Sequence, residues 1–416
     1  MREAVPMGDM VGASIELDVT NIAHGGISVA RLDGRVIFVT DAIPGERVLA
    51  RIVDDNKKSF WRADTLAIID ASPHRRDHVW SAASVERDPA DRAGGAEFGH
   101  IELAHQRELK RQVIADSLSR MAGIQSAVTV EAVGDDDERG GIGWRTRVRL
   151  HVDESGRPGP FAARSHRVIP VSDLPLATPE LAAIAPLDQL FAGGEHVDVL
   201  SPSIGGPRLI IGNQKTSVIT ETVGFRKFRL ADRGFWQVHR DAPATLTAAV
   251  QDAIDPDRFD TGAANLDLYG GVGLLAAAVG DRFGSATRIT SVESDATATD
   301  FASTNLAEWI GARAETGRVE RWIAALDASA GTHERSRLAA ATIILDPPRS
   351  GAGRAIVDAL GRLAPAQVVY VACDPVAFAR DAELMHHAGF ELARVRAYDL
   401  FPHTHHVEAV GTFIRT

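Results

Sequence analysis

The chain has 416 residues, more than one hydrophobic core usually organises, so two or three domains are expected. Apolar residues make up 45% of it and charged residues 24%, as in ordinary globular proteins, and it holds no apolar run of about 18 residues that could span a membrane. A single cysteine excludes an internal disulfide framework, and a start without a signal-like apolar segment predicts a cytoplasmic protein.

The formal net charge of −11, taken over the whole chain, argues against a nucleic-acid partner. Two stretches are nevertheless basic: residues 145–167 hold six arginines against two acidic residues, and residues 205–240 hold seven basic residues against two acidic ones. Local patches govern RNA binding more than the global sum does. Such stretches are commonly solvated faces, however, so they do not establish an RNA partner by themselves.

Residues 14–70 show the alternation and the turn signals of short β-strands. Residues 15–20 alternate, Gly25-Gly26 interrupts the pattern, and it resumes over 27–31. Asp33-Gly34 is a two-residue hairpin signal between residues 29–32 and 35–40. The remaining predicted strands cover residues 35–40, 47–53 and 64–70. Five strands packed into so short a segment predict a small barrel of the OB type.

The tip before the last of these strands, residues 57–62, reads Lys-Lys-Ser-Phe-Trp-Arg and places cations beside aromatic rings. This composition suits contact with phosphates and stacking on bases. It fits equally well an exposed turn whose aromatic side chains plug the barrel. The sequence leaves both interpretations open.

The middle of the chain predicts a second, mixed domain. Residues 71–100 are polar and interrupted by prolines and glycines, which predicts an irregular linker, and a helix is predicted over 102–121. Strands are predicted over 146–152, 209–212 and 217–223, with a helix over 179–192 between them.

From about residue 245 the pattern changes to alternating strands and helices, which is typical of a parallel sheet covered by helices. Helices are predicted over 296–310 and 353–363. The predicted strands cover residues 264–268, 288–292, 342–345, 367–371 and 407–414.

The first of these strands runs into a glycine-rich turn, from Asp267 to Gly273, that leads into an apolar helix. Glycines at such a turn let a ligand approach the backbone at a helix N-terminus. The next strand ends at Glu293, where an acid can bind ribose hydroxyls. The pattern favours a nucleoside cofactor, although a tight strand–helix turn would look similar.

Two later strands end in polar side chains. One runs into Asp346-Pro347-Pro348, and the other ends at Cys373 before Asp374-Pro375. The carboxyl edge of an open α/β sheet is where ligands bind. The alternatives are a strand stopped by proline and a cysteine that serves as a small buried hydrophobe.

Three histidines close together, His403, His405 and His406, suggest a metal site at first sight. In an extended chain His406 would point away from the other two, and no cysteine assists them. No metal site is therefore predicted.

Several stretches, in this order along the chain, resemble the RNA 5-methyluridine methyltransferases that carry an N-terminal TRAM domain. They are Phe235-Trp236-Gln237-Val238, Asp267-Leu268-Tyr269-Gly270-Gly271-Val272-Gly273, Asp346-Pro347-Pro348-Arg349, Cys373-Asp374-Pro375 and Phe401-Pro402-x-Thr404-x-His406-Val407-Glu408. Residues 25–46 look like TRAM, and Arg164-Ser165-His166 matches the central domain, so the resemblance covers nearly the whole chain.

The resemblance implies a three-part α/β protein. An OB-like TRAM β-barrel over residues 1–72 would bind RNA, residues 73–238 would form a linker, a helix and a central mixed α+β domain, and residues 239–416 would form a Rossmann-like methyltransferase domain. By motif, Cys373 would be the nucleophile and Glu408 the general base. The residues expected to contact S-adenosylmethionine (SAM) are Gln237, Tyr269, Gly271, Glu293, Asp346 and, in addition, Asp327.

The implied activity is SAM-dependent methylation of carbon 5 of a uridine in tRNA or rRNA, through a covalent adduct between Cys373 and the uracil. The chain is expected to act as a monomer, with RNA as its partner and without a membrane.

Three departures from the family pattern bear on this expectation. Many members hold an iron–sulfur cluster between the barrel and the first helix, but residues 78–101 contain no cysteine, so no cluster is expected. His239 and Asp374 each stand where asparagine is usual. These departures keep open an RNA-binding or chaperone-like protein with lost or altered methyltransferase activity, and an enzyme that methylates cytosine or a non-RNA acceptor.

Overall fold

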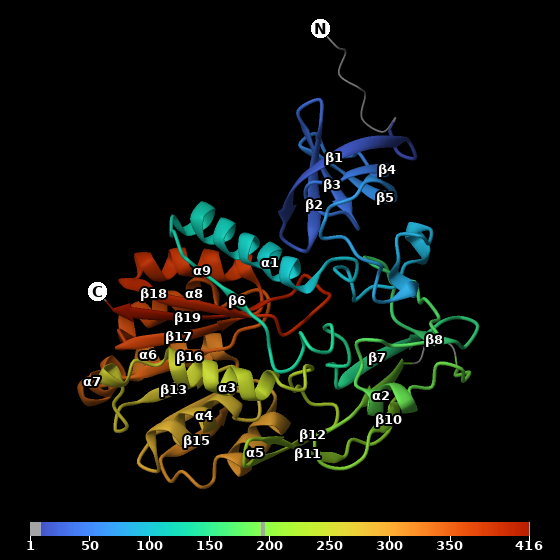
Figure 1. Ribbon diagram of the computed structural model, residues 1–416. Helices are drawn as coiled ribbons and strands as arrows, with labels where there is room; N and C mark the ends of the chain where they lie inside the picture. Colours follow the sequence, from blue (N-terminus) through green and yellow to red (C-terminus); the bar gives the residue numbers. More distant parts are fainter. Residues whose placement is uncertain (1–9, 193–195, 416) are drawn as a thin grey trace.

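The computed structural model describes residues 10–192 and 196–415, and its N-terminal part is a closed five-stranded barrel (Figure 1). The strands lie in the order β1-β2-β3-β5-β4, and the predicted barrel is confirmed. Every second side chain of β4 is buried, which is the alternation that the sequence displayed. The strands are β1 (Ser14–Ala23), β2 (Ile27–Leu32), β3 (Arg35–Thr40), β4 (Arg47–Asp54) and β5 (Phe60–Asp70).

The two aromatic residues of the segment 57–62 point to opposite sides of the barrel wall. Both belong to β5, which begins at Phe60, and successive side chains of a strand alternate in direction. Trp61 is buried in the barrel core. Phe60 points the other way, with its ring 5.3 Å from that of Phe38 and the guanidinium of Arg62 5.6 Å from its centre. One aromatic residue therefore fills the barrel while its neighbour forms an outer aromatic surface.

The linker after the barrel is irregular but well packed. Trp80 and two short 3-10 turns, at Ser81–Ala83 and Pro89–Asp91, lead to α1 (Leu103–Ser117), which continues as a wide turn to Ala122. Helix α1 packs against α9 (Pro375–His387) and also contacts β1, so it lies between the barrel and the C-terminal part (Figure 1).

The central part contains a four-stranded sheet and a separate hairpin. The predicted helix over 179–192 is shorter than expected: α2 (Pro179–Ile184) stops because Pro186 forces Ala185 into an extended conformation. The sheet has the order β10-β9-β7-β8, and strands β8, β9 and β12 were not predicted. The strands are β7 (Arg147–Val152), β8 (Pro158–Gly159), β9 (His196–Leu200), β10 (Arg208–Ile211), β11 (Val218–Val223) and β12 (Arg226–Ala231).

The C-terminal part is an eight-stranded sheet in the order β15-β14-β13-β16-β17-β19-β18-β6, and the predicted α/β fold is confirmed. The run from β15 to β17 is parallel, whereas β19 is antiparallel to both of its neighbours. The strands are β13 (Asn265–Leu268), β14 (Ile289–Glu293), β15 (Ala312–Thr316), β16 (Thr342–Leu345), β17 (Gln367–Ala372), β18 (Phe390–Tyr398), β19 (Glu408–Arg415) and β6 (Val130–Glu131).

Helices cover both faces of this sheet, so the central strands β16 and β17 are buried along their whole length. Helices α1, α6, α8 and α9 pack in one core, and α3 and α4 pack in the other (Figure 1). No helix within the described ranges is long and apolar enough to cross a membrane. The remaining helices are α3 (Ala242–Ala253), α4 (Leu274–Phe283), α5 (Ala296–Asn305), α6 (Val319–Ser329), α7 (Thr332–Ala339) and α8 (Gly353–Leu363).

Candidate active site

A cleft of about 730 Å³ opens at the carboxyl edge of the large sheet, where it also touches the central part. It brings together most of the residues that the sequence singled out. These are Gln237, Tyr269, Gly271, Glu293, Asp346, Cys373 and Glu408. Asp327 does not join them: it lies on α6, where it accepts hydrogen bonds from Arg335 (3.2 Å) and Arg362 (2.6 Å).

The glycine turn forms one wall of the cleft, between β13 and α4. Gly270 packs against Ser291 and Asp267 so closely that no side chain would fit there. The N–H of Gly271 donates to the Glu293 carboxylate (3.2 Å), which also accepts from the N–H of Asp295 (2.9 Å). The turn and the acid at the end of β14 therefore hold each other in place at the cleft wall.

Two aspartates lie near this wall: Asp267 is fully buried behind it, and Asp346 is partly buried and lines the cleft. Asp267 Oδ2 accepts from the N–H of Ala276 and the hydroxyl of Ser291, both at 3.2 Å, while its Oδ1 has no hydrogen-bond partner in the described part of the chain. Burial raises the pKa of Asp267 to about 7. Burial, assisted by the charge of Asp267, raises the pKa of Asp346 to about 7 as well. The cleft is therefore electrostatically suited to a positively charged ligand.

Cys373 and Glu408 lie together at the end of the cleft nearest the barrel. Ala372 of β17 pairs with Ala409 of β19, so the next position outward brings Cys373 opposite Glu408. Burial, then the charges of Glu408 and Asp346, raise the pKa of the Cys373 thiol to about 12, whereas Arg349 acts in the opposite direction. Burial also raises the pKa of Glu408 well above its usual range.

The histidines near this edge make specific contacts instead of gathering into a metal site. The side-chain N–H of Gln106 donates to Nδ1 of His403 (3.0 Å), and Nε2 of His403 donates to the carbonyl of Gly140 (2.8 Å). Arg349 donates to Nε2 of His406 (3.2 Å), so that nitrogen is unprotonated. Among residues 10–192 and 196–415, no three His, Cys, Asp or Glu side chains are arranged to hold a metal ion.

The two departures from asparagine have structural roles. His239 is fully buried beneath Trp144, where its Nε2 donates to Asp136 (2.9 Å) and its Nδ1 accepts from the N–H of Asp241 (3.0 Å). Asp374 caps α9 by accepting from the N–H groups of Val376 (3.0 Å) and Ala377 (2.8 Å), which an asparagine oxygen would also do. Neither His239 nor Asp374 lines the cleft.

Three further cleft residues received no role from the sequence. Phe235 is 75% exposed at the cleft, although it lies in one of the family motifs. Arg145 begins the basic stretch noted above, and its Nε donates to the carbonyl of Arg147 (3.0 Å). Glu97 comes from the linker and accepts from the N–H of Gly95 (2.9 Å). The sequence offered only a motif position or a local charge for these residues, and neither signal predicts that a side chain lines the cleft.

The two ends of the chain match two different protein families. Residues 8–60 match the TRAM domain, and residues 259–416 match the tRNA (Uracil-5-)-methyltransferase family. The solved structure of the Pyrococcus abyssi tRNA (uracil-54, C5)-methyltransferase in complex with S-adenosyl-L-homocysteine has the same fold. Its TM-score is 0.69 at 19% identity, covering 96% of this chain and all of the other.

Full-length relatives are similar in sequence as well. An RNA methyltransferase of Streptomyces avermitilis is 34% identical over 96% of this chain and 98% of its own length. An RNA methyltransferase of Bifidobacterium longum is 31% identical over 100% of this chain and 99% of its own. The chain therefore belongs to the TRAM-domain-containing RNA (uracil-5-)-methyltransferase family of enzymes.

Proposed function

We propose that this protein uses SAM to methylate carbon 5 of a uridine in tRNA or rRNA, with Cys373 as the nucleophile and Glu408 as the general base. The observation that carries the proposal is the pairing of a thiol and a carboxylate at one end of a cleft whose wall is the glycine turn. Since the chain has a single cysteine, no other residue can supply a thiolate.

The other end of the cleft suits SAM, which would supply the methyl group. Desolvation raises the pKa values of Asp267 and Asp346, and a positive charge entering the cleft would favour their ionised forms. Glu293 presents its carboxylate where ribose hydroxyls can donate to it. Gln237, Tyr269 and Gly271 complete this wall. Asp327 is left out of the proposal, because it lies away from the cleft.

The thiol and the carboxylate supply the two groups that methylation of carbon 5 requires, a nucleophile and a base. Carbon 5 of uracil is a poor nucleophile, but addition of the Cys373 thiolate to carbon 6 turns the ring into an enolate that is reactive at carbon 5. After methyl transfer, Glu408 takes the proton from carbon 5, and the bond between Sγ and carbon 6 breaks to restore the ring. Arg349 favours the ionised form of both groups, because its charge opposes the effect of burial on each pKa.

The proposed substrate is a uridine that has left its stack, because a base inside a helix cannot reach the cleft. Phe235, largely exposed at the cleft, offers a surface on which such a base can stack. On the barrel, Arg62 lies over the rings of Phe38 (5.9 Å) and Phe60 (5.6 Å), a combination suited to single-stranded RNA.

We also infer that the protein works without an iron–sulfur cluster, because one cysteine cannot supply the usual four ligands. Side chains fill this part of the linker: the ring of His78 packs 6.1 Å from that of His100, and its Nε2 donates to the carbonyl of Ala96 (3.1 Å). Protein purified without oxygen should be colourless. A visible absorption band that tracks with iron content would contradict this inference.

The decisive experiment is incubation with methyl-labelled SAM and bulk tRNA or rRNA, followed by mass spectrometry of the nucleosides. The proposal expects label in 5-methyluridine. Label in 5-methylcytidine would instead assign a cytosine substrate. RNA retention without any methylated nucleoside would indicate a binding protein that has lost turnover.

A further inference from the structure

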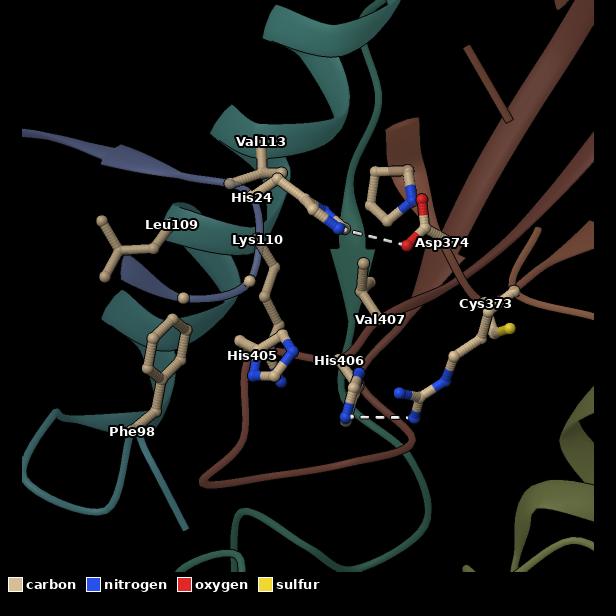
Figure 2. A pocket seen from close by; sticks show the side chains of 14 residues that line it. His24, Phe98, Leu109, Lys110, Val113, Cys373, Asp374, His405, His406 and Val407 are labelled. Carbon is tan, nitrogen blue, oxygen red and sulfur yellow. Dashed lines mark hydrogen bonds and ion pairs between the residues drawn. The ribbon is translucent and has the colours of Figure 1, made fainter. Parts of the chain in front are cut away.

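The turn between β1 and β2 of the barrel is packed into the edge of the active site. Together with Cys373, Asp374 and His405, residues 24–26 line a small cavity of about 80 Å³ (Figure 2). Gly26 has φ +69°, and a Cβ there would approach the Cβ of His405 to 2.5 Å. The fit is therefore close enough to fix where the turn sits relative to the two loops that carry Cys373 and His405.

His24, at the start of this turn, is joined to the residue next to the nucleophile. Its Nε2 lies 3.2 Å from Oδ2 of Asp374, and Figure 2 shows the ring pointing at that carboxylate. The second oxygen of Asp374 accepts the N–H groups of Val376 and Ala377 at the start of α9. One carboxylate thus connects the barrel, the Cys373 loop and a helix end.

We propose that His24 is a positioning residue for Cys373, and that through Asp374 the RNA-binding barrel holds the nucleophile in place. The geometry makes the connection short: β17 ends at Ala372, and Cys373 is the single residue between this strand and the capping Asp374. A shift of Asp374 must therefore move Cys373. Attack on a ring carbon tolerates little displacement, since an error of about 1 Å can cost about 100-fold in rate.

Each partner in this contact favours the charged form of the other. The hydrogen bond to Asp374 is the largest influence that raises the pKa of His24, against burial and the nearby Arg349. The pKa of Asp374 is lowered, with His24 and the helix N–H groups outweighing burial. The pair is therefore lost above the raised pKa of His24 and below the lowered pKa of Asp374. The other basic side chains around the cavity are Lys110, His405 and His406.

The test uses the fact that Cys373 is the only cysteine, so its reaction with iodoacetamide can be followed in the intact protein without SAM or RNA. If His24 holds the loop, His24→Ala should expose the half-buried thiol and raise its alkylation rate at pH 7 by about three-fold or more. Asp374→Asn keeps the cap of α9 but also removes a charge that raises the pKa of the thiol, so it should raise the rate at least as much. Adding His24→Ala to Asp374→Asn should then change the rate little, because the contact is already broken.

Two controls separate position from charge. His24→Lys keeps a cation beside Asp374, so Cys373 should be alkylated as slowly as in the unmutated protein. His333→Gln changes a histidine on the exposed surface of α7, and it should also leave the alkylation rate unchanged. The difference between His24→Ala and the unmutated protein should shrink above the raised pKa of His24, where the pair is absent in both.

An unchanged alkylation rate in a folded His24→Ala protein would overturn the proposal. A slower rate would overturn it too, because it would mean that the freed charge of Asp374 suppresses the thiolate without releasing the loop. The role rests on the proposed function of Cys373, but this measurement does not. If alkylation responds as expected while no RNA is methylated, the proposed function fails and the mechanical link stands. If both hold, kcat for methylation should fall in His24→Ala while the affinity for SAM stays the same.

Discussion

Cys373 and Glu408 stand opposite each other one position beyond the Ala372–Ala409 pair, where β17 ends and β19 begins. The antiparallel direction of β19 makes this possible. Because β19 runs antiparallel to β17, it begins at the sheet edge where β17 ends. The residue that follows β17 and the first residue of β19 therefore lie at the same edge. The thiol and the carboxylate, the proposed nucleophile and base, are thereby held by the backbone of two adjacent strands.

Replacing the nucleophile tests the covalent mechanism directly. Cys373→Ala should abolish methylation, and it should also abolish trapping by RNA that contains 5-fluorouridine, whose fluorine cannot leave as a cation. Binding of SAM should survive, since the thiol lies at the far end of the cleft from the glycine turn. Denaturing gels and calorimetry measure the two properties. Residual methylation by Cys373→Ala would rule out the covalent route.

Replacing the base should produce a different failure. Glu408→Gln should still permit addition and methyl transfer, but the thiol cannot leave until the carbon 5 proton has gone. The variant should accumulate a protein–RNA adduct that survives denaturation, with Cys373 attached to a methylated base. Mass spectrometry of the crosslinked peptide identifies it. An inactive variant that forms no adduct would show that Glu408 acts before or during methyl transfer.

The ribose contact proposed for Glu293 can be measured without RNA. Glu293→Ala should weaken SAM binding by roughly 1.5–3 kcal/mol, the usual value of a hydrogen bond to a charged group. Glu293→Gln keeps the size of the side chain and one of the two oxygens that accept the N–H groups of Gly271 and Asp295, so it separates loss of charge from loss of the side chain. Unchanged calorimetric affinity in a folded Glu293→Ala protein would remove Glu293 from the site.

Asp267 and Asp346 should make SAM binding depend on pH. Asp267 and Asp346 each have a pKa of about 7, so they are mostly protonated at pH 6 and mostly ionised at pH 8. A cationic ligand prefers the ionised form, so the affinity for SAM should rise by about ten-fold over this range if one ionisation is required. S-adenosylhomocysteine has no sulfonium charge and should show a smaller change. Asp346→Asn should flatten the SAM profile, and equal profiles for the two ligands would contradict this account.

The barrel should contribute electrostatic binding energy despite the acidic net charge of the chain. Changing Lys57 and Lys58 to Ala should reduce the slope of log affinity against log salt by about 0.7 for each phosphate of single-stranded RNA that these lysines neutralise. Arg318→Ala, on the exposed start of α6, is the matched control and should leave the slope unchanged. Affinity that does not vary with salt would indicate an acceptor other than RNA.

The sequence predicted the buried strands best, because a strand covered on both faces must be apolar throughout. Thr342–Leu345 is such a strand, and its bounds agree with the structure. The strand at Ala312–Thr316 was missed, since it lies at the sheet edge and has an alanine-rich, partly charged sequence. Strand Phe390–Tyr398 was missed for a similar reason: charged side chains alternate along its exposed face.

The sequence predicted the residues of the candidate site that lie at strand ends. It could not predict contacts that form only when distant parts of the chain pack together. Cys373, Glu408 and Asp346 follow or begin buried strands, so topology alone collects them. Asp327 is one of many acidic residues in the sequence, and only the structure shows that it lies on α6 in salt bridges with Arg335 and Arg362. The partner of His239 is Asp136, 103 residues earlier in the chain, which no local pattern reveals.

The position of β19 in the large sheet has a consequence for biosynthesis. This strand lies between β17 and β18 and carries Glu408, yet the ribosome makes it after every other strand of its sheet. The barrel, by contrast, closes from a single continuous segment near the start of the chain. Domains fold as their residues emerge, so the nascent protein would complete its TRAM barrel early and would place Glu408, the proposed base, last. Under the proposed function, the nascent protein would then be able to hold RNA before it is able to methylate it.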